Sequence, residues 1–171
     1  GFTDFDAEGM LIEGFDQLST MATIYNYPYY PAHMERLGFG KATDWIEMKL
    51  IVPEKLPEQY AKIAEIVKRR LNLHTRKLKN IREIKKTGIG YHIFELINEA
   101  YKPLYGYCEL SKAQIEQYVN NYMQIIDLRM VTLVEDAENN LVGVGISMPS
   151  LSRALQKAKG KLWPFGWWHI I

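Results

Sequence analysis

Residues 131–148 read Val-Thr-Leu-Val-Glu-Asp-Ala-Glu-Asn-Asn-Leu-Val-Gly-Val-Gly-Ile-Ser-Met, and this stretch decides the fold class. Two runs rich in β-branched residues flank a polar turn that contains Asn139 and Asn140. Such a pattern predicts a β-hairpin. Helical spacing of apolar residues prevails in much of the remaining sequence. A hairpin among helices predicts an α+β fold, with a mixed, largely antiparallel sheet flanked by helices.

Apolar stripes at helical spacing predict the helices. The clearest stripe covers 57–71, where Pro57 suits a first helical turn. Serines at positions 111 and 150 suit N-caps. The other helices are predicted at 26–36, 80–86, 91–101, 112–126 and 150–159.

Two further stretches alternate between apolar and polar residues, as strands do. Residues 43–52 place Ile46, Met48, Leu50 and Val52 on one face, and a proline follows them. Residues 73–78 form the second candidate. We therefore expect strands at both places, in addition to the hairpin.

Composition excludes several classes of protein. The chain has 171 residues, of which 47% are hydrophobic, so it can bury a core without disulfides or metal. Its 21 basic residues nearly balance 20 acidic residues, which argues against a strongly basic nucleic-acid binder. A single cysteine suits a reducing compartment, so we expect a cytoplasmic protein. No apolar run is long enough to span a membrane, and no membrane partner is predicted.

The two ends of the sequence suggest a piece of a longer protein. The chain begins at Gly1 without a methionine and ends in the apolar stretch 165–171, whereas domain ends are usually polar. The alternative is a complete small protein with a processed N-terminus.

The sequence contains no familiar catalytic or metal motif. The four histidines, at positions 33, 74, 92 and 169, never pair at helical spacing, so no metal site is predicted. No serine lies in a Gly-x-Ser-x-Gly setting. Gly143 and Gly145 favour a bulge or a close backbone approach over a wall for a flat ligand. The basic stretch 68–86 favours a solvated face over an anion or RNA patch, because no aromatic residue lies within it.

The densest polar and aromatic cluster lies between residues 25 and 30. Tyrosine rings offer contact area together with one hydroxyl, so such clusters often line pockets or interfaces. The candidate substrate-binding residues are Asn26, Tyr27, Tyr29 and Tyr30. The alternative is that they anchor the short helix that follows.

Residues 29–39 (Tyr-Tyr-Pro-Ala-His-Met-Glu-Arg-Leu-Gly-Phe), followed by Trp-Ile-Glu-Met at 45–48, resemble the last helix and strand of GNAT-superfamily N-acetyltransferases. The second half resembles the opening of another GNAT unit, with a first strand at 75–78, two helices and the hairpin. Residues 1–30 and 148–152 are similar to an uncharacterised bacterial group with two such units. The resemblance implies that 1–53 end a first unit, 54–72 form a connecting helix, and 73–171 begin a second unit.

The resemblance also implies a function. An intact member would transfer an acetyl group from acetyl-CoA to a small-molecule or peptide amine. The family's pyrophosphate loop, [QR]-x-x-G-x-[GA], is absent here, so no cofactor is assigned to this chain. Met34 stands where the family often has a general-acid tyrosine, and Tyr30 lies one helical turn earlier. The catalytic residues stay unassigned, and the chain is expected to be inactive alone.

A second hypothesis is a non-catalytic interaction module on a degenerate GNAT scaffold. An unpaired sheet edge would then favour self-association into a dimer or another homo-oligomer. No nucleic-acid partner is predicted under either hypothesis.

Overall fold

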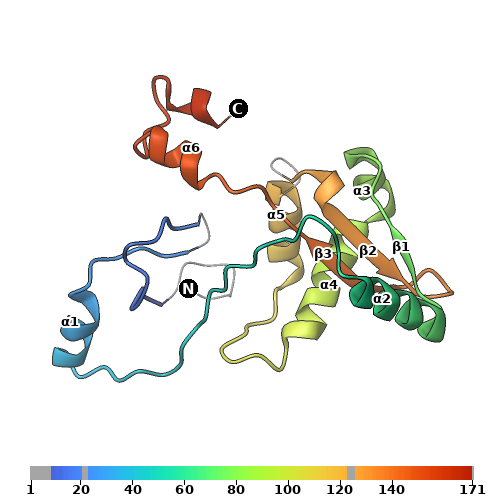
Figure 1. Cartoon of the computed structure of the whole chain (residues 1–171), viewed down its shortest axis with the longest axis horizontal. Helices are drawn as coiled ribbons and strands as arrows, with labels where there is room; N and C mark the ends of the chain where they lie inside the picture. The colour runs from blue at the N-terminus through green and yellow to red at the C-terminus, as the bar shows by residue number, and fades with distance from the viewer. Residues whose placement is uncertain (1–8, 21–22, 123–125, 171) are drawn as a thin grey trace. The chain divides into compact units, whose positions relative to one another are not determined.

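The protein was analysed as a computed structural model, which describes residues 9–20, 23–122 and 126–170 (Figure 1). The chain divides into two compact units. One comprises residues 49–148, and the other comprises 1–48 together with 149–171. The predicted division at 53 and 72 concerns GNAT units and stays a prediction. The two compact units are described separately below.

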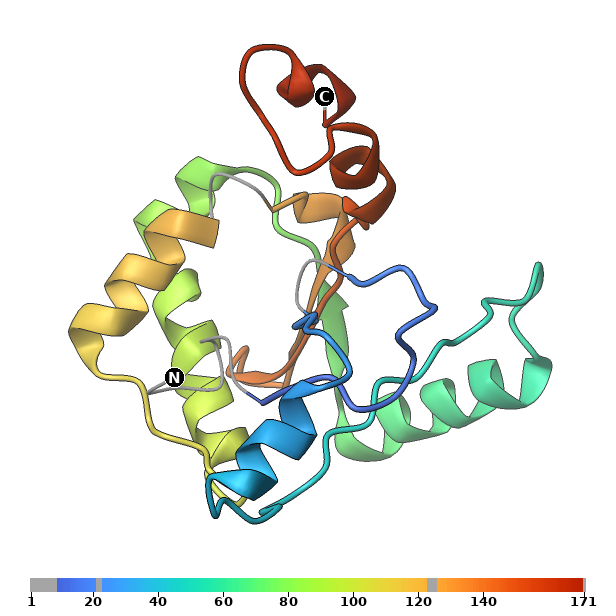
Figure 2. The same cartoon turned by 90° about the vertical axis from the view of Figure 1, so that its left-hand side faces the viewer.

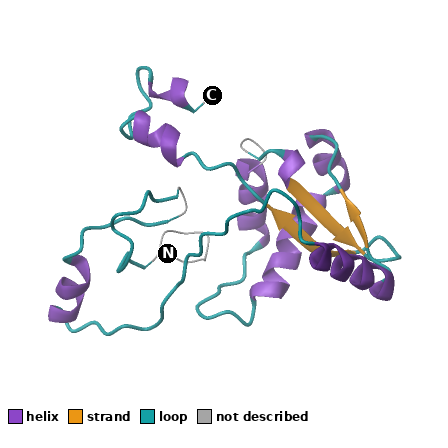
Figure 3. Cartoon of the chain, in the orientation of Figure 1, coloured by secondary structure: helices purple, strands orange, loops and turns teal. Residues whose placement is uncertain are grey.

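The larger unit contains a three-stranded antiparallel sheet, coloured orange in Figure 3, with the strand order β1-β2-β3. Its strands are β1 (His74–Arg76), β2 (Val131–Glu135) and β3 (Leu141–Ile146). The predicted hairpin is confirmed as β2 and β3. Asp136 closes its turn, because its carboxylate accepts hydrogen bonds from the backbone amides of Glu138 and Asn140.

One irregularity interrupts the hairpin. The register of β2 against β3 shifts between Val134 and Glu135, which is a β-bulge. A Cβ atom placed on Gly143 would lie 3.3 Å from the Cβ of Val134, so this glycine permits a close cross-strand approach. The structure therefore supports the bulge that the glycine pattern predicted.

The described part of this unit also contains the α-helices α2 (Glu58–Leu71), α3 (Ile81–Thr87), α4 (Ile89–Tyr101) and α5 (Lys112–Tyr122), and the short 3₁₀ helix η1 (Leu128–Met130). The Asn80 side chain caps α3 by accepting a hydrogen bond from the Glu83 amide at 3.0 Å. Gly88, with φ of 68°, lies between α3 and α4. The helix predicted at 112–126 is described as far as Tyr122, and residues 123–125 lie outside the described residues.

The core forms between the sheet and helices α3 and α4. Leu133 is fully buried at the centre of the sheet, and Val131 is nearly so. Helix α4 packs against β3 and against α5, which runs alongside it in Figure 2. The buried hydrophobic cluster comprises Leu78, Ile84, Ile89, Ile93, Val131 and Leu133.

The strand predicted at 43–52 is wrong. These residues form neither helix nor strand, and Ile46, Leu50 and Val52 are each at least 80% exposed. Alternation gives a segment an apolar face, but a strand also needs a hydrogen-bonding neighbour. No strand in the described part of the chain pairs with it. Helix α2 is likewise amphipathic but has no buried residue.

The smaller unit contains short helices. They are α1 (Tyr30–Arg36), α6 (Ser152–Lys157) and the 3₁₀ helix η2 (Gly166–His169). The predicted helices at 26–36 and 150–159 are therefore present but shorter. Helix α1 begins at Tyr30 because Pro31 suits a first helical turn, and Gly38, with φ of 86°, follows its end.

Candidate functional site

The side chain of Asn26 forms hydrogen bonds with nearby backbone groups. Its Oδ1 accepts a hydrogen bond from the Leu11 amide at 2.6 Å, and its Nδ2 donates to the carbonyl oxygens of Leu11 and Tyr27 at 3.1 and 3.0 Å. The residue is buried. Asn26 therefore holds two separate loop segments together, and its predicted contact with a substrate stays a prediction.

The three tyrosines of the predicted cluster do come together. The rings of Tyr27 and Tyr29 stack with centroids 5.9 Å apart, and those of Tyr29 and Tyr30 lie 5.0 Å apart. All three are exposed. The neighbouring groups partly exclude water from the Tyr29 hydroxyl, and this desolvation raises the pKa of Tyr29 above 10.0. The charge of Tyr30 raises the same pKa further. The three tyrosines therefore form an exposed aromatic surface.

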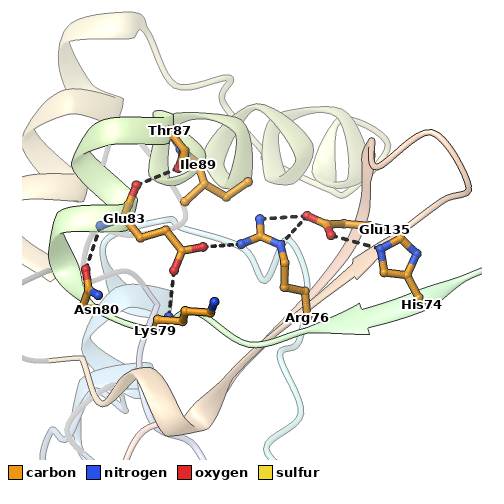
Figure 4. A network of polar contacts seen from close by, with 8 residues as sticks. All are labelled: His74, Arg76, Lys79, Asn80, Glu83, Thr87, Ile89 and Glu135. Atoms are coloured by element: carbon orange, nitrogen blue, oxygen red, sulfur yellow. Dashed lines mark hydrogen bonds and ion pairs between the residues drawn. The ribbon is translucent and has the colours of Figure 1, made fainter.

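A denser polar constellation lies between β1 and β2. His74 and Glu135 are directly opposite in the antiparallel register. The His74 Nε2 atom lies 3.4 Å from Oε2 of Glu135 (Figure 4). The Glu135 side chain is only 5% exposed, whereas that of His74 is 46% exposed. The pair thus joins a buried carboxylate to an imidazole that solvent can reach.

Arg76 binds the other oxygen of the same carboxylate. Its Nε and Nη2 atoms both lie 2.8 Å from Oε1 of Glu135. Its Nη1 atom donates to Oε1 of Glu83 at 2.5 Å, and the second oxygen of Glu83 accepts from the Lys79 amide at 2.9 Å. One guanidinium therefore bridges two carboxylates and ties β1 to β2 and to α3 (Figure 4).

The residue types of this arrangement suit proton transfer. When Nε2 of an imidazole donates to a carboxylate, the lone pair of Nδ1 becomes the basic position of the ring. Glu135 approaches Nε2 of His74 to 3.4 Å, an ion-pair contact that would orient the ring with Nδ1 as the basic nitrogen. Arg76 fixes Glu135 from the opposite side. His74 could thus serve as a general base, with Glu135 as the residue that orients it and Arg76 as the residue that holds Glu135.

Two pockets adjoin this network along α3. The first, of about 520 Å³, is lined by Asn80, Ile81, Arg82 and Leu128. Glu83 lines the second, of about 480 Å³, together with Lys79, Arg82 and Lys86 among others. Glu83, whose carboxylate receives Arg76, is therefore also one of the residues that line this open hollow. In the described residues, no cluster of histidine, cysteine or acidic side chains could hold a metal ion.

Sequence reasoning missed this constellation. His74 was considered only as a possible metal ligand, and its partner Glu135 lies at the end of the predicted hairpin strand. The sequence did place both residues in predicted strands, His74 in 73–78 and Glu135 in the hairpin. Their pairing depends on which strands are neighbours and in what register, which alternation alone does not determine.

Comparison with known proteins gives two similar sequences. A protein of Caulobacter vibrioides named bacterial ceramide synthase is 26% identical over 166 residues, covering 95% of this chain and 41% of the relative. Protein YghO of Escherichia coli is 21% identical over 167 residues, covering 95% of this chain and 40% of the relative. The chain thus spans about two fifths of the length of these relatives. No family model and no solved structure matches.

These findings correct the predicted activity. The sequence analysis expected acetyl transfer from acetyl-CoA to an amine, with a non-catalytic module as the alternative. The name of the Caulobacter relative refers instead to ceramide synthesis. The acetyl-transfer prediction is therefore wrong, and neither expectation is carried forward. In the described part of the chain, no helix has the length and hydrophobicity that a membrane span requires.

Proposed function

We propose that this chain is part of an N-acyltransferase that forms a ceramide-type lipid. A ceramide is the amide of a fatty acid and a long-chain amino alcohol. The observation that carries the proposal is the similarity to the protein named bacterial ceramide synthase, which extends over 95% of the chain. The substrates are thus a long-chain amino alcohol and an activated fatty acyl group.

The acyl donor in this proposal is a thioester, the class that the GNAT resemblance implies. The amine nitrogen attacks the thioester carbonyl carbon, the new C–N bond forms, and the C–S bond breaks. The amine loses one proton and the leaving thiolate takes one up, so the products are an amide and a thiol. This balance requires a group that accepts the amine proton and returns it.

We assign that role to His74. Its imidazole is half exposed, so an amine can approach it, and Glu135 faces its other nitrogen. A charged amine must lose a proton before it can attack, and a general base positioned beside the amine serves that step. Arg76 is a positioning residue, because it holds the Glu135 carboxylate in place.

The arrangement of β1, the helices α3 to α5, and the β2–β3 hairpin supports a GNAT-like scaffold for this proposal. A first strand, then helices, then a hairpin is the order that the resemblance implies for the opening of a unit. Three antiparallel strands in the order β1-β2-β3 are consistent with it. Homo-oligomerisation through the sheet edge stays a prediction.

The test compares lipids from cells that carry or lack the gene for this chain. Mass spectrometry of the extracts should show that N-acylated long-chain amino alcohols disappear on deletion and that the free amine accumulates. The wild-type gene should restore the amides. A gene with His74→Gln should restore less than about 1%, because general-base catalysis contributes about 10²–10⁴-fold.

The matched control is His92→Gln, which changes an exposed histidine on α4. It should restore the amides fully. An amide pool that is unchanged by the deletion would refute the proposed function. Full restoration by His74→Gln would leave the function standing but would remove His74 from the mechanism.

A further inference from the structure

Residues 152–170 form an ordered, compact turn that we call the tryptophan knob. It comprises α6, a loop, and the 3₁₀ helix η2, which packs on α6. The Gly160 amide donates to the Leu155 carbonyl oxygen at 3.1 Å, and the Trp167 amide donates to the Leu162 carbonyl oxygen at 3.1 Å. The chain therefore returns on itself through specific backbone hydrogen bonds.

Glycine at position 166 is required by this turn. A Cβ atom at that position would overlap the Lys161 carbonyl oxygen, so the backbone approaches more closely than a side chain allows. The indole Nε1 of Trp167 donates to the Pro164 carbonyl oxygen at 2.9 Å. The backbone of the loop thus follows a defined path.

Those aromatic side chains are exposed to solvent. Trp163 is 84% exposed, Phe165 is 76% exposed and Trp168 is 73% exposed, and Leu162 lies beside them in the sequence. These rings leave a large apolar area in contact with water, which is unfavourable. Exposed apolar area of this kind often marks a site of interaction. Indole rings, which combine apolar area with one polar N–H, are enriched where membranes meet water.

The charge of this segment has a single sign. Residues 149–171 contain Arg153, Lys157, Lys159 and Lys161 but neither aspartate nor glutamate. All four basic side chains are exposed. None of them takes part in the ion pairs that the structure gives for the described residues. The knob therefore presents four cations with no acidic residue in the same segment.

We propose that the tryptophan knob docks on the surface of an anionic phospholipid membrane. The lysines would lie among the negatively charged headgroups, and Trp163, Phe165 and Trp168 would enter the boundary between headgroups and acyl chains. The sequence predicts no membrane partner, because no apolar run in it is long enough to span a bilayer. A surface anchor requires no span, so that argument does not apply to this segment.

The combination of features selects a lipid surface over other partners. A nucleic acid would match the cations, but several outward apolar side chains would stay in water beside its phosphates. An apolar protein groove would match the rings but would not use the cations. Anionic lipid offers both charge and apolar depth. Helix α2 is the competing surface, since it is amphipathic and exposed. Its glutamates Glu58 and Glu65 pair with Lys62 and Lys68, so its net charge is smaller than that of the knob, which contains no acidic residue.

The test measures vesicle binding by the whole chain. Trp45→Phe leaves the three tryptophans of the knob as the fluorescent reporters. Vesicles contain either phosphatidylcholine alone or phosphatidylcholine mixed with phosphatidylglycerol. We expect sedimentation with the mixed vesicles only, a blue shift of the tryptophan emission, and weaker binding as salt is added.

Three variants locate the binding. The triple variant Lys157→Gln, Lys159→Gln and Lys161→Gln should bind roughly 100-fold more weakly, at about fivefold per lysine. The variant Lys68→Gln, Arg69→Gln and Arg70→Gln removes the same charge from α2 and should bind as the parent does. Trp163→Ser with Trp168→Ser should weaken binding by about tenfold or more at unchanged charge.

Several results would overturn the proposal. These are absence of binding to the mixed vesicles, equal binding to neutral vesicles, or a larger loss from the α2 variant than from the knob variant. A dimer in sedimentation that buries the tryptophans without lipid would also overturn it. Vesicle binding is measured without any acyl transfer, so its outcome is independent of the proposed function.

Discussion

Replacing Arg76 with methionine tests whether the network at β1 and β2 is a coupled unit. Methionine keeps much of the aliphatic volume of arginine but removes the positive charge. The Glu135 carboxylate, which is 5% exposed, would then lose two contacts of 2.8 Å. Glu83 would lose its contact with the same guanidinium.

The expected cost follows from the burial of the two partners. Removing one partner of a buried ion pair destabilises a protein by about 3–5 kcal/mol, because a charge is left buried and unpaired. The Arg76 side chain is 32% exposed, so we expect the lower end of that range, about 3 kcal/mol. A change of that size lowers the melting temperature of a domain as small as the unit 49–148 by about 12–24 °C.

Urea denaturation followed by circular dichroism measures the free energy of unfolding. The double variant Arg76→Met with Glu135→Leu removes both charges of this pair and leaves only the partly exposed Glu83 without the guanidinium. It should recover to within about 1 kcal/mol of the wild type. Arg129→Met is the control, since Arg129 forms a pair with Asp127 in which its side chain is 90% exposed, and it should cause no measurable change. A cost of less than about 1 kcal/mol for the single variant, or a double variant no more stable than the single, would refute the reasoning.

Two further predictions concern the hairpin. Leu133→Ala empties a fully buried position in β2 and should cost about 3–5 kcal/mol, whereas Val142→Ala, at a position 45% exposed, should cost far less; urea denaturation distinguishes the two. Hydrogen bonds from the Asn140 side chain and then its backbone amide lower the pKa of Asp136 below 3.8, so its contribution to stability is present above that pH and is lost as the pH falls further. The stability gap between the wild type and Asp136→Asn should therefore be largest at neutral pH and should close below 3.8, and a gap independent of pH would contradict this.

The sequence was sufficient to predict an element where the residues that determine it lie within that element. The hairpin and the helix Glu58–Leu71 lie close to the predicted positions, because turn residues, a starting proline and apolar spacing act over a few residues. The same reasoning failed at 43–52. Its alternation equals that of a strand, but pairing depends on a partner that lies elsewhere in the chain.

The candidate site shows the same limit. The cluster of Tyr27, Tyr29 and Tyr30 could be predicted, because its members are neighbours in the sequence. The pair of His74 and Glu135 could not, since only the register of β1 against β2 brings the two residues together. Burial of Glu135 likewise depends on the helices that cover the sheet, and no local pattern marks a glutamate in a strand as buried.

The most direct test of the central claim is the reaction itself. The protein produced from the natural gene is incubated with a long-chain amino alcohol and a ¹³C-labelled long-chain acyl thioester, and the lipids are analysed by mass spectrometry. The proposed function predicts a labelled N-acyl product, with release of one thiol for each amide formed. Release of thiol without labelled amide, or no reaction of the amino alcohol at all, would contradict it.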